Sequence, residues 1–135
     1  MRIAITGGNG FLGRRVAAAL AARGVEKDIL LVDTVERPDP PAGCRQFVGD
    51  VADPLFLAEA LPDDVTSIFH LAAVVSAEAE ADYDLGMRVN VDGVRALIER
   101  CRALPHPPRW CPSPCPQQGR RRRRPASRVP SCASR

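Results

Sequence analysis

The stretch Thr6-Gly7-Gly8-Asn9-Gly10-Phe11-Leu12-Gly13 directly follows a short apolar run at residues 3–5. An apolar run before a glycine-rich turn predicts a buried strand that turns sharply into a helix, because glycine adopts backbone conformations that strain other residues. The alanine-rich residues 16–22 continue this helix, and Gly24 is placed to end it. The N-terminus of such a helix presents free N–H groups to phosphate oxygens.

Three of the glycines have distinct expected roles. Gly7 allows the sharp turn, Gly10 allows the backbone to approach a pyrophosphate closely, and Gly13 allows the helix to pack tightly on the sheet. A second predicted strand ends at Asp33, 20 residues beyond Gly13, where an acid can accept hydrogen bonds from an adenosine ribose. The pattern predicts a dinucleotide-binding unit. A tight turn that binds nothing is the less favoured alternative.

The glycine spacing resembles the Thr-Gly-x-x-Gly-x-x-Gly signature of extended short-chain dehydrogenases, the NAD-dependent epimerase/dehydratase family. Three further motifs follow in the order of that family, namely Gly49-Asp50-Val51, Phe69-His70-Leu71-Ala72-Ala73 and Asn90-Val91-Asp92-Gly93. The resemblance covers residues 1 to about 104. Residues 70–92 are further similar to the D-erythronate dehydrogenase branch.

This resemblance implies which residues contact the cofactor. In the family, the aspartate after the third strand contacts the adenine, the fourth-strand motif lines the ribose side, and the asparagine on the next helix supports the active site. Carried onto this chain, the expected cofactor-binding residues are Gly7, Gly10, Phe11, Leu12, Gly13, Asp33, Asp50, Val51, Leu71, Ala72, Ala73 and Asn90. We expect NAD rather than NADP, because the Asp33 carboxylate would repel a 2′-phosphate, although the nearby Arg37 weakens this discrimination.

The family transfers hydride with a tyrosine acid/base and a lysine four residues later. A phenol with a pKa near 10 needs such a cation to act near neutral pH. The one tyrosine of this chain is Tyr83, position 87 is methionine, and the only lysine is Lys27. We therefore expect Tyr83 to be a packing residue, His70 to be structural, and the chain to contain no catalytic residue and no metal site. The prediction is an inactive, truncated NAD-binding portion of an oxidoreductase or epimerase that acts on a sugar or sugar acid.

Charge and composition divide the chain near residue 104. The net charge is +3, yet residues 105–135 contain eight arginines, eight of the 13 prolines and no acidic residue. So few aliphatic side chains cannot offset the entropy of ordering, which predicts a disordered basic tail after a folded domain at residues 1–104. Because prolines alternate within residues 109–116, we expect no fifth strand there. A frameshift in the gene is the favoured explanation of the tail.

The predicted fold is α/β, a partial doubly wound parallel sheet of the Rossmann, NAD(P)-binding type with strand order 3-2-1-4. Strands are expected at residues 2–6, 29–33, 44–48 and 67–71, and helices at 11–23, 54–61 and 83–103, with Asp53 and Asp82 as N-caps. Without a fifth strand, the fourth would form an exposed edge, so we expect marginal stability and aggregation.

The arginine run at residues 120–124 supports an alternative function. The chain would then be a noncatalytic dinucleotide-binding protein whose tail binds polyanions non-specifically. No run of about 20 apolar residues and no secretory signal are recognisable, so we expect a cytoplasmic protein with no membrane contact. The sequence does not identify the substrate or the oligomeric state.

Overall fold

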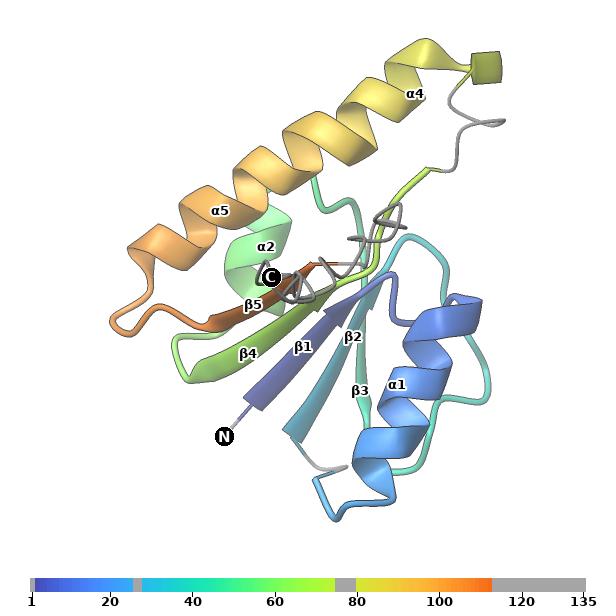
Figure 1. The fold of residues 1–135 in the computed structure, drawn as a ribbon, viewed down its shortest axis with the longest axis vertical. Coiled ribbons are helices and arrows are strands. Elements are labelled where there is room, and N and C mark those ends of the chain that lie inside the picture. Colours follow the sequence, from blue (N-terminus) through green and yellow to red (C-terminus); the bar gives the residue numbers. More distant parts are fainter. Residues whose placement is uncertain (1, 26–27, 75–79, 113–135) are drawn as a thin grey trace, which may run out of the picture.

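The computed structural model describes residues 2–25, 28–74 and 80–112. Five parallel strands form one sheet in the order β3-β2-β1-β4-β5 (Figure 1). The strands are β1 (Arg2–Thr6), β2 (Ile29–Asp33), β3 (Arg45–Val48), β4 (Val65–His70) and β5 (Arg109–Pro112). The helices are α1 (Phe11–Ala21), α2 (Pro54–Ala60), α4 (Tyr83–Met87), η2 (Arg88–Asp92) and α5 (Gly93–Ala103). The predicted parallel α/β fold and the order of its first four strands are confirmed.

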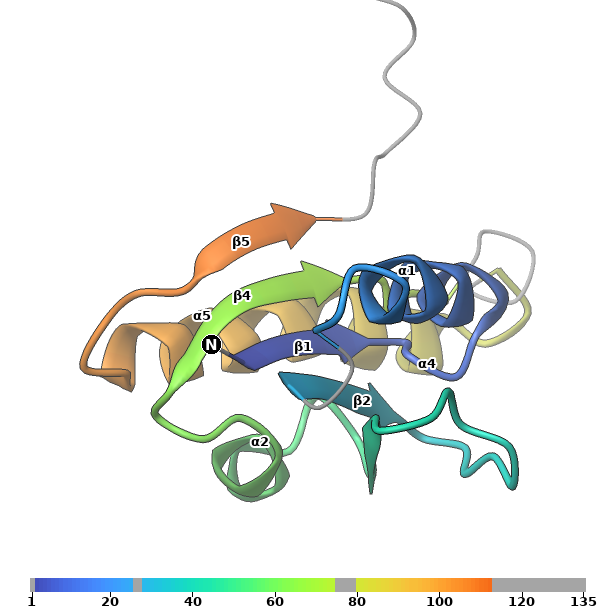
Figure 2. The same ribbon diagram turned by 90° about the horizontal axis from the view of Figure 1, so that it is seen from below.

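Helices cover both faces of this sheet (Figures 1 and 2). Successive side chains of a strand point to opposite faces, so neighbouring residues of β1 belong to different cores. Ala4 packs in one core with Leu57 of α2 and Leu97 of α5. Ile5 packs in the other core with Ala17 of α1. All five of these side chains are fully buried. Because all the strands pair in parallel, their carboxyl ends lie together at one edge of the sheet.

The expected helix caps form, but one expected helix contains an irregular turn. The Asp53 carboxylate accepts a hydrogen bond from the Leu55 N–H at 2.9 Å, and Asp82 does the same for Leu85 at 2.9 Å. The helix predicted over residues 83–103 runs as α4, η2 and α5, where η2 is a π-helical turn. Such turns inside α-helices occur frequently at functional sites.

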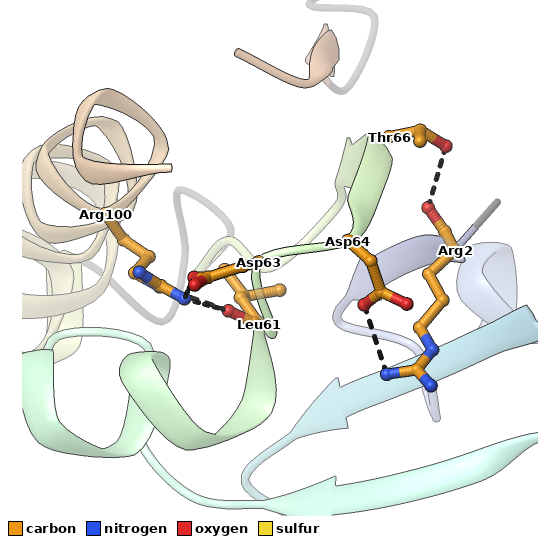
Figure 3. A network of polar contacts seen from close by, with 6 residues as sticks. All are labelled: Arg2, Leu61, Asp63, Asp64, Thr66 and Arg100. Carbon is orange, nitrogen blue, oxygen red and sulfur yellow. Dashed lines mark hydrogen bonds and ion pairs between the residues drawn. The ribbon is translucent and has the colours of Figure 1, made fainter. Parts of the chain in front are cut away.

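Polar contacts fix the amino-terminal end of β4 (Figure 3). Arg100 on α5 donates from Nε and Nη2 to the Leu61 carbonyl, at 3.1 and 2.6 Å, and Nη2 lies 2.9 Å from the Asp63 carboxylate. Arg2 pairs with Asp64 at 3.2 Å, and the Thr66 hydroxyl donates to the Arg2 carbonyl at 3.1 Å. These contacts join α5, α2 and β1 at the end of the sheet opposite the glycine turn.

The structure corrects the expectation that no fifth strand forms. Residues 109–112 pair with β4 in parallel, with Trp110 opposite Ile68. The prolines do not prevent this, because Pro112 is the last residue of β5 and, among the described residues, β5 is an edge strand, where a missing N–H is tolerated. The expected exposed edge on β4 was therefore wrong: Ile68 is fully buried, and β4 lies between β1 and β5.

Other expectations concern residues outside the described ranges. These residues include the predicted tail from residue 113 onward, with its arginine run at 120–124. The frameshift stays a prediction about the gene. Among the residues that the structure describes, no helix is long and apolar enough to cross a membrane.

Candidate functional site

The turn between β1 and α1 depends on two glycines that no other residue could replace without strain. Gly7 has a φ of 67°, and a Cβ there would lie 2.8 Å from the Ala72 backbone nitrogen. A Cβ on Gly13 would lie 2.2 Å from the Gly7 carbonyl oxygen. The first turn of α1 thus packs directly on the backbone of the glycine loop. The predicted sharp turn at Gly7 is confirmed, and Gly13 serves tight packing against the loop backbone.

Among the described residues, no side chain caps the N-terminus of α1. The first turn of this helix contains no acidic residue. Gly10 is the N-cap, with an extended backbone, and a Cβ there would meet only the Gly7 carbonyl oxygen, at 3.2 Å. Free N–H groups and the positive end of the helix dipole are therefore available to an anion.

A cleft of about 370 Å³ lies at the carboxyl ends of the strands. Its walls come from the glycine turn, the ends of β2 and β3, the segment after β4, and the helix α4–η2. The lining residues are Gly7, Gly10, Asp33, Thr34, Asp50, Val51, Leu71, Ala72, Ala73, Val74, Leu85 and Val89. In open parallel sheets, ligands bind in the crevice beyond the carboxyl ends of the strands.

Eight of the twelve expected cofactor-binding residues line this cleft, namely Gly7, Gly10, Asp33, Asp50, Val51, Leu71, Ala72 and Ala73. The other four do not. Phe11 and Leu12 are 78% and 44% exposed on α1, Gly13 is buried under the turn, and Asn90 lines hollows on the helix surface. Sequence reasoning missed Thr34, Val74, Leu85 and Val89, since only the fold brings them to the cleft.

Asp33 is held in place by the glycine turn and by its own loop. Its Oδ2 accepts a hydrogen bond from the Asn9 N–H at 2.9 Å, and its Oδ1 accepts one from the Val35 N–H at 3.3 Å. An ionised carboxylate has about four acceptor positions. Asp33 therefore keeps capacity for hydroxyl donors of a ligand in the cleft.

Asp50 forms an ion pair across the cleft with the π-helical turn. Its Oδ1 accepts a hydrogen bond from the Ala52 N–H at 2.8 Å, and its Oδ2 lies 2.6 Å from Nε of Arg88. Burial alone would raise the pKa of Asp50, but the Ala52 N–H and the Arg88 guanidinium outweigh it and hold that pKa below its ordinary value. This ion pair joins the segment after β3 to the helix that forms another wall of the cleft.

Asn90 shapes the cleft through the backbone of another residue. It is exposed on the helix. Its Oδ1 accepts a hydrogen bond from the Val74 N–H at 2.9 Å, and its Nδ2 donates to the Val74 carbonyl at 3.0 Å. Because Val74 lines the cleft, Asn90 fixes the position of that wall from the helix.

His70 has a structural environment, as expected. Its Nδ1 lies 2.7 Å from the hydroxyl of Thr6, which also accepts a hydrogen bond from the Ala72 N–H at 3.3 Å. Its ring is 5.4 Å from that of Trp110. Burial lowers the pKa of His70. Through Thr6, the imidazole joins the end of β1 to the segment that lines the cleft.

Tyr83 is not the packing residue that the sequence suggested. It is 69% exposed at the start of α4, with methionine four residues later. Among the residues that the structure describes, no cation contacts Tyr83, so Tyr83 forms no acid/base pair of the tyrosine–lysine type there. Within the described ranges, no three His, Cys, Asp or Glu side chains are grouped to hold a metal ion.

Comparison with known proteins agrees with this geometry. Residues 4–105 match a model of one family over most of the chain. The chain belongs to the 3-beta hydroxysteroid dehydrogenase/isomerase family. Members of this family are NAD(P)-dependent dehydrogenases. The predicted membership of the extended short-chain dehydrogenases is confirmed.

Individual relatives support the finer resemblance. A D-erythronate dehydrogenase from Cupriavidus necator is 47% identical over 119 residues, which cover 81% of this chain. A nucleoside-diphosphate-sugar epimerase from Agrobacterium tumefaciens is 37% identical over 76% of this chain, with a TM-score of 0.62. The holo form of an L-threonine dehydrogenase from Cupriavidus necator is 25% identical over 76%, with a TM-score of 0.69. The expected likeness to D-erythronate dehydrogenases is thus confirmed.

The chain spans about a third of the length of these relatives: 37% of the D-erythronate dehydrogenase, 32% of the epimerase and 33% of the L-threonine dehydrogenase. The residues present nevertheless fit a nicotinamide dinucleotide. The uncapped N-terminus of α1 suits a pyrophosphate, and Asp33 at the end of β2 suits a ribose.

Proposed function

We propose that this chain binds NAD in the cleft. The observation that carries the proposal is the convergence of eight expected residues, from four separate segments, on one cleft at the carboxyl ends of parallel strands. Gly10 and the N-terminus of α1 would hold the pyrophosphate, Asp33 the adenosine ribose, and Asp50 with Val51 the adenine. The Leu71–Ala73 segment would line the other ribose.

Asp33 would also select NAD over NADP. Its carboxylate would accept hydrogen bonds from the free ribose hydroxyls of NAD, whereas it would repel the additional phosphate of NADP. The fixed hydrogen bonds from Asn9 and Val35 keep the carboxylate from turning away. Hydrogen bonds to charged groups contribute about 1.5–3 kcal/mol, so the preference should be measurable.

The chemistry of the relatives suggests a substrate class. A sugar acid is the substrate type that the name D-erythronate dehydrogenase implies for that relative, and bound NAD would supply a hydride acceptor. We propose that this chain alone transfers no hydride, because it lacks the tyrosine–lysine pair. A cytoplasmic location and polyanion binding by residues 120–124 remain predictions from the sequence.

Calorimetric titration tests the proposed binding. Wild type, Asp33→Asn and Gly10→Val are titrated with NAD and with NADP. We expect wild type to prefer NAD, Asp33→Asn to bind NAD at least about tenfold more weakly, and Gly10→Val to bind neither. No binding of NAD to a folded wild-type chain would refute the proposal. An unchanged preference in Asp33→Asn would refute only the role of Asp33.

A further inference from the structure

We propose that Gln46 on β3 is a positioning residue that sets the preference between NAD and NADP without touching either. The inference rests on the proposed binding of NAD in the cleft. Gln46 does not line the cleft. It contacts the two segments that hold Asp33, the glycine turn and the loop after β2.

The Gln46 amide joins these segments through three hydrogen bonds. Its Oε1 accepts from Nδ2 of Asn9 at 2.8 Å and from the Arg37 N–H at 3.2 Å. Its Nε2 donates to the Arg37 carbonyl at 2.7 Å. Both backbone groups of Arg37 are therefore satisfied by one side chain, which pairs with the loop as a neighbouring strand would. A hydrocarbon side chain at position 46 would lose all three contacts.

Asn9 passes this restraint on to Asp33. The Asn9 side chain donates to the Val35 carbonyl at 2.7 Å as well as to Gln46, and its backbone N–H donates to Asp33. Asn9 is only 4% exposed, so water cannot replace the hydrogen-bond partners of its amide. Val35 in turn donates to Asp33. Gln46 therefore acts indirectly on both groups that orient the Asp33 carboxylate, the Asn9 N–H and the Val35 N–H.

The position of Arg37 gives the effect its direction. Arg37 lines a hollow with Phe11, Arg14 and Arg15 of α1, separate from the cleft that Asp33 lines. Because Gln46 holds the Arg37 backbone, this residue stays at the hollow beside α1. Releasing the loop would loosen Asp33, the residue whose carboxylate favours NAD. It would also free Arg37, a cation that attracts a 2′-phosphate. Both changes lower the preference for NAD.

The test measures the ratio of the dissociation constants of NADP and NAD for the full chain. For Gln46→Met, which keeps the length of the side chain, we expect the ratio to fall at least about threefold, the equivalent of one net hydrogen bond. A general loss of stability would weaken the binding of both cofactors equally and leave the ratio of their dissociation constants unchanged.

Thr66→Val is the matched control. It removes one hydrogen bond from another strand of the same sheet, to the Arg2 carbonyl at 3.1 Å, at the end opposite the cleft (Figure 3). Its ratio should equal that of the wild type. If wild type prefers NAD and Gln46→Met keeps the same ratio, the role of Gln46 is refuted. If wild type binds neither cofactor, the proposed function itself fails.

Discussion

Two glycines of the same turn should respond differently to the addition of one methyl group. A Cβ on Gly13 would lie 2.2 Å from the Gly7 carbonyl oxygen and 2.7 Å from Cα of Gly8. Both are backbone atoms, so no side chain can move aside, and α1 must shift away from the loop. A Cβ on Gly10 would meet only the Gly7 oxygen, at 3.2 Å, and the extended backbone there suits any residue.

The magnitude follows from the cost of overpacking. Forcing an additional methyl into a packed site costs about 1–3 kcal/mol, and the contact of Gly13 with fixed backbone places it at the upper end, about 3 kcal/mol. The unfolding entropy of a chain of this size converts 3 kcal/mol into a fall in Tm of roughly 10 °C. For Gly10→Ala we expect a fall of at most about 3 °C, since the neighbour need move only slightly.

Thermal unfolding followed by circular dichroism measures both changes, and NAD titration of the folded variants completes the experiment. Gly13→Ala should lose stability, while Gly10→Ala should keep stability and bind NAD more weakly, because its methyl group occupies the path to the helix N-terminus. A Gly13→Ala variant as stable as wild type would show that α1 does not pack on the turn as described. Equal losses of stability in both variants would refute the division of roles.

Three further variants test separate contacts. Burial lowers the pKa of His70, so its contribution to stability is full above the ordinary value of about 6.5 and is lost as the pH falls through the lowered pKa. His70→Asn should therefore reduce the loss of stability between about pH 7 and pH 5. Arg100→Met leaves the buried Leu61 carbonyl without its partner and should cost about 1–3 kcal/mol of unfolding free energy in denaturant titrations, against less than about 0.5 kcal/mol for Arg95→Met, whose partner is exposed. Asn90→Leu removes both hydrogen bonds to Val74, so hydrogen exchange of the Val74 amide should become faster, and unchanged protection would show that Asn90 does not hold this wall.

Most of the fold could be predicted because its signals are local. The strand before Gly7 and the strand that ends at Asp33 lie where the apolar runs place them, and Asp53 and Asp82 cap their helices as short-range rules require. The glycine spacing identified the turn, since residues 7, 10 and 13 form a pattern that is recognisable within eight residues of sequence.

The missed features depend on contacts between distant residues. Asn9 and Gln46 are 37 positions apart, and nothing near either residue indicates that they meet. The π-helical turn at residues 88–92 has no recognisable signal either. The fifth strand was missed because the proline rule was applied to the whole segment 109–116, although residues 109–111 precede the first of its prolines and pair with an interior strand.

The most direct test of the central claim is a titration of the ¹⁵N-labelled chain with NAD, followed by backbone amide chemical shifts. We predict that the largest changes fall on the cleft, at Gly7, Gly10, Asp33 and the segment 71–74. Amides at the opposite end of the sheet, at residues 63–66 (Figure 3), should stay unchanged. Chemical-shift changes centred on another surface would contradict the account. The absence of any change at NAD concentrations well above 1 mM would contradict it too, because a dissociation constant of 1 mM corresponds to only about 4 kcal/mol of binding.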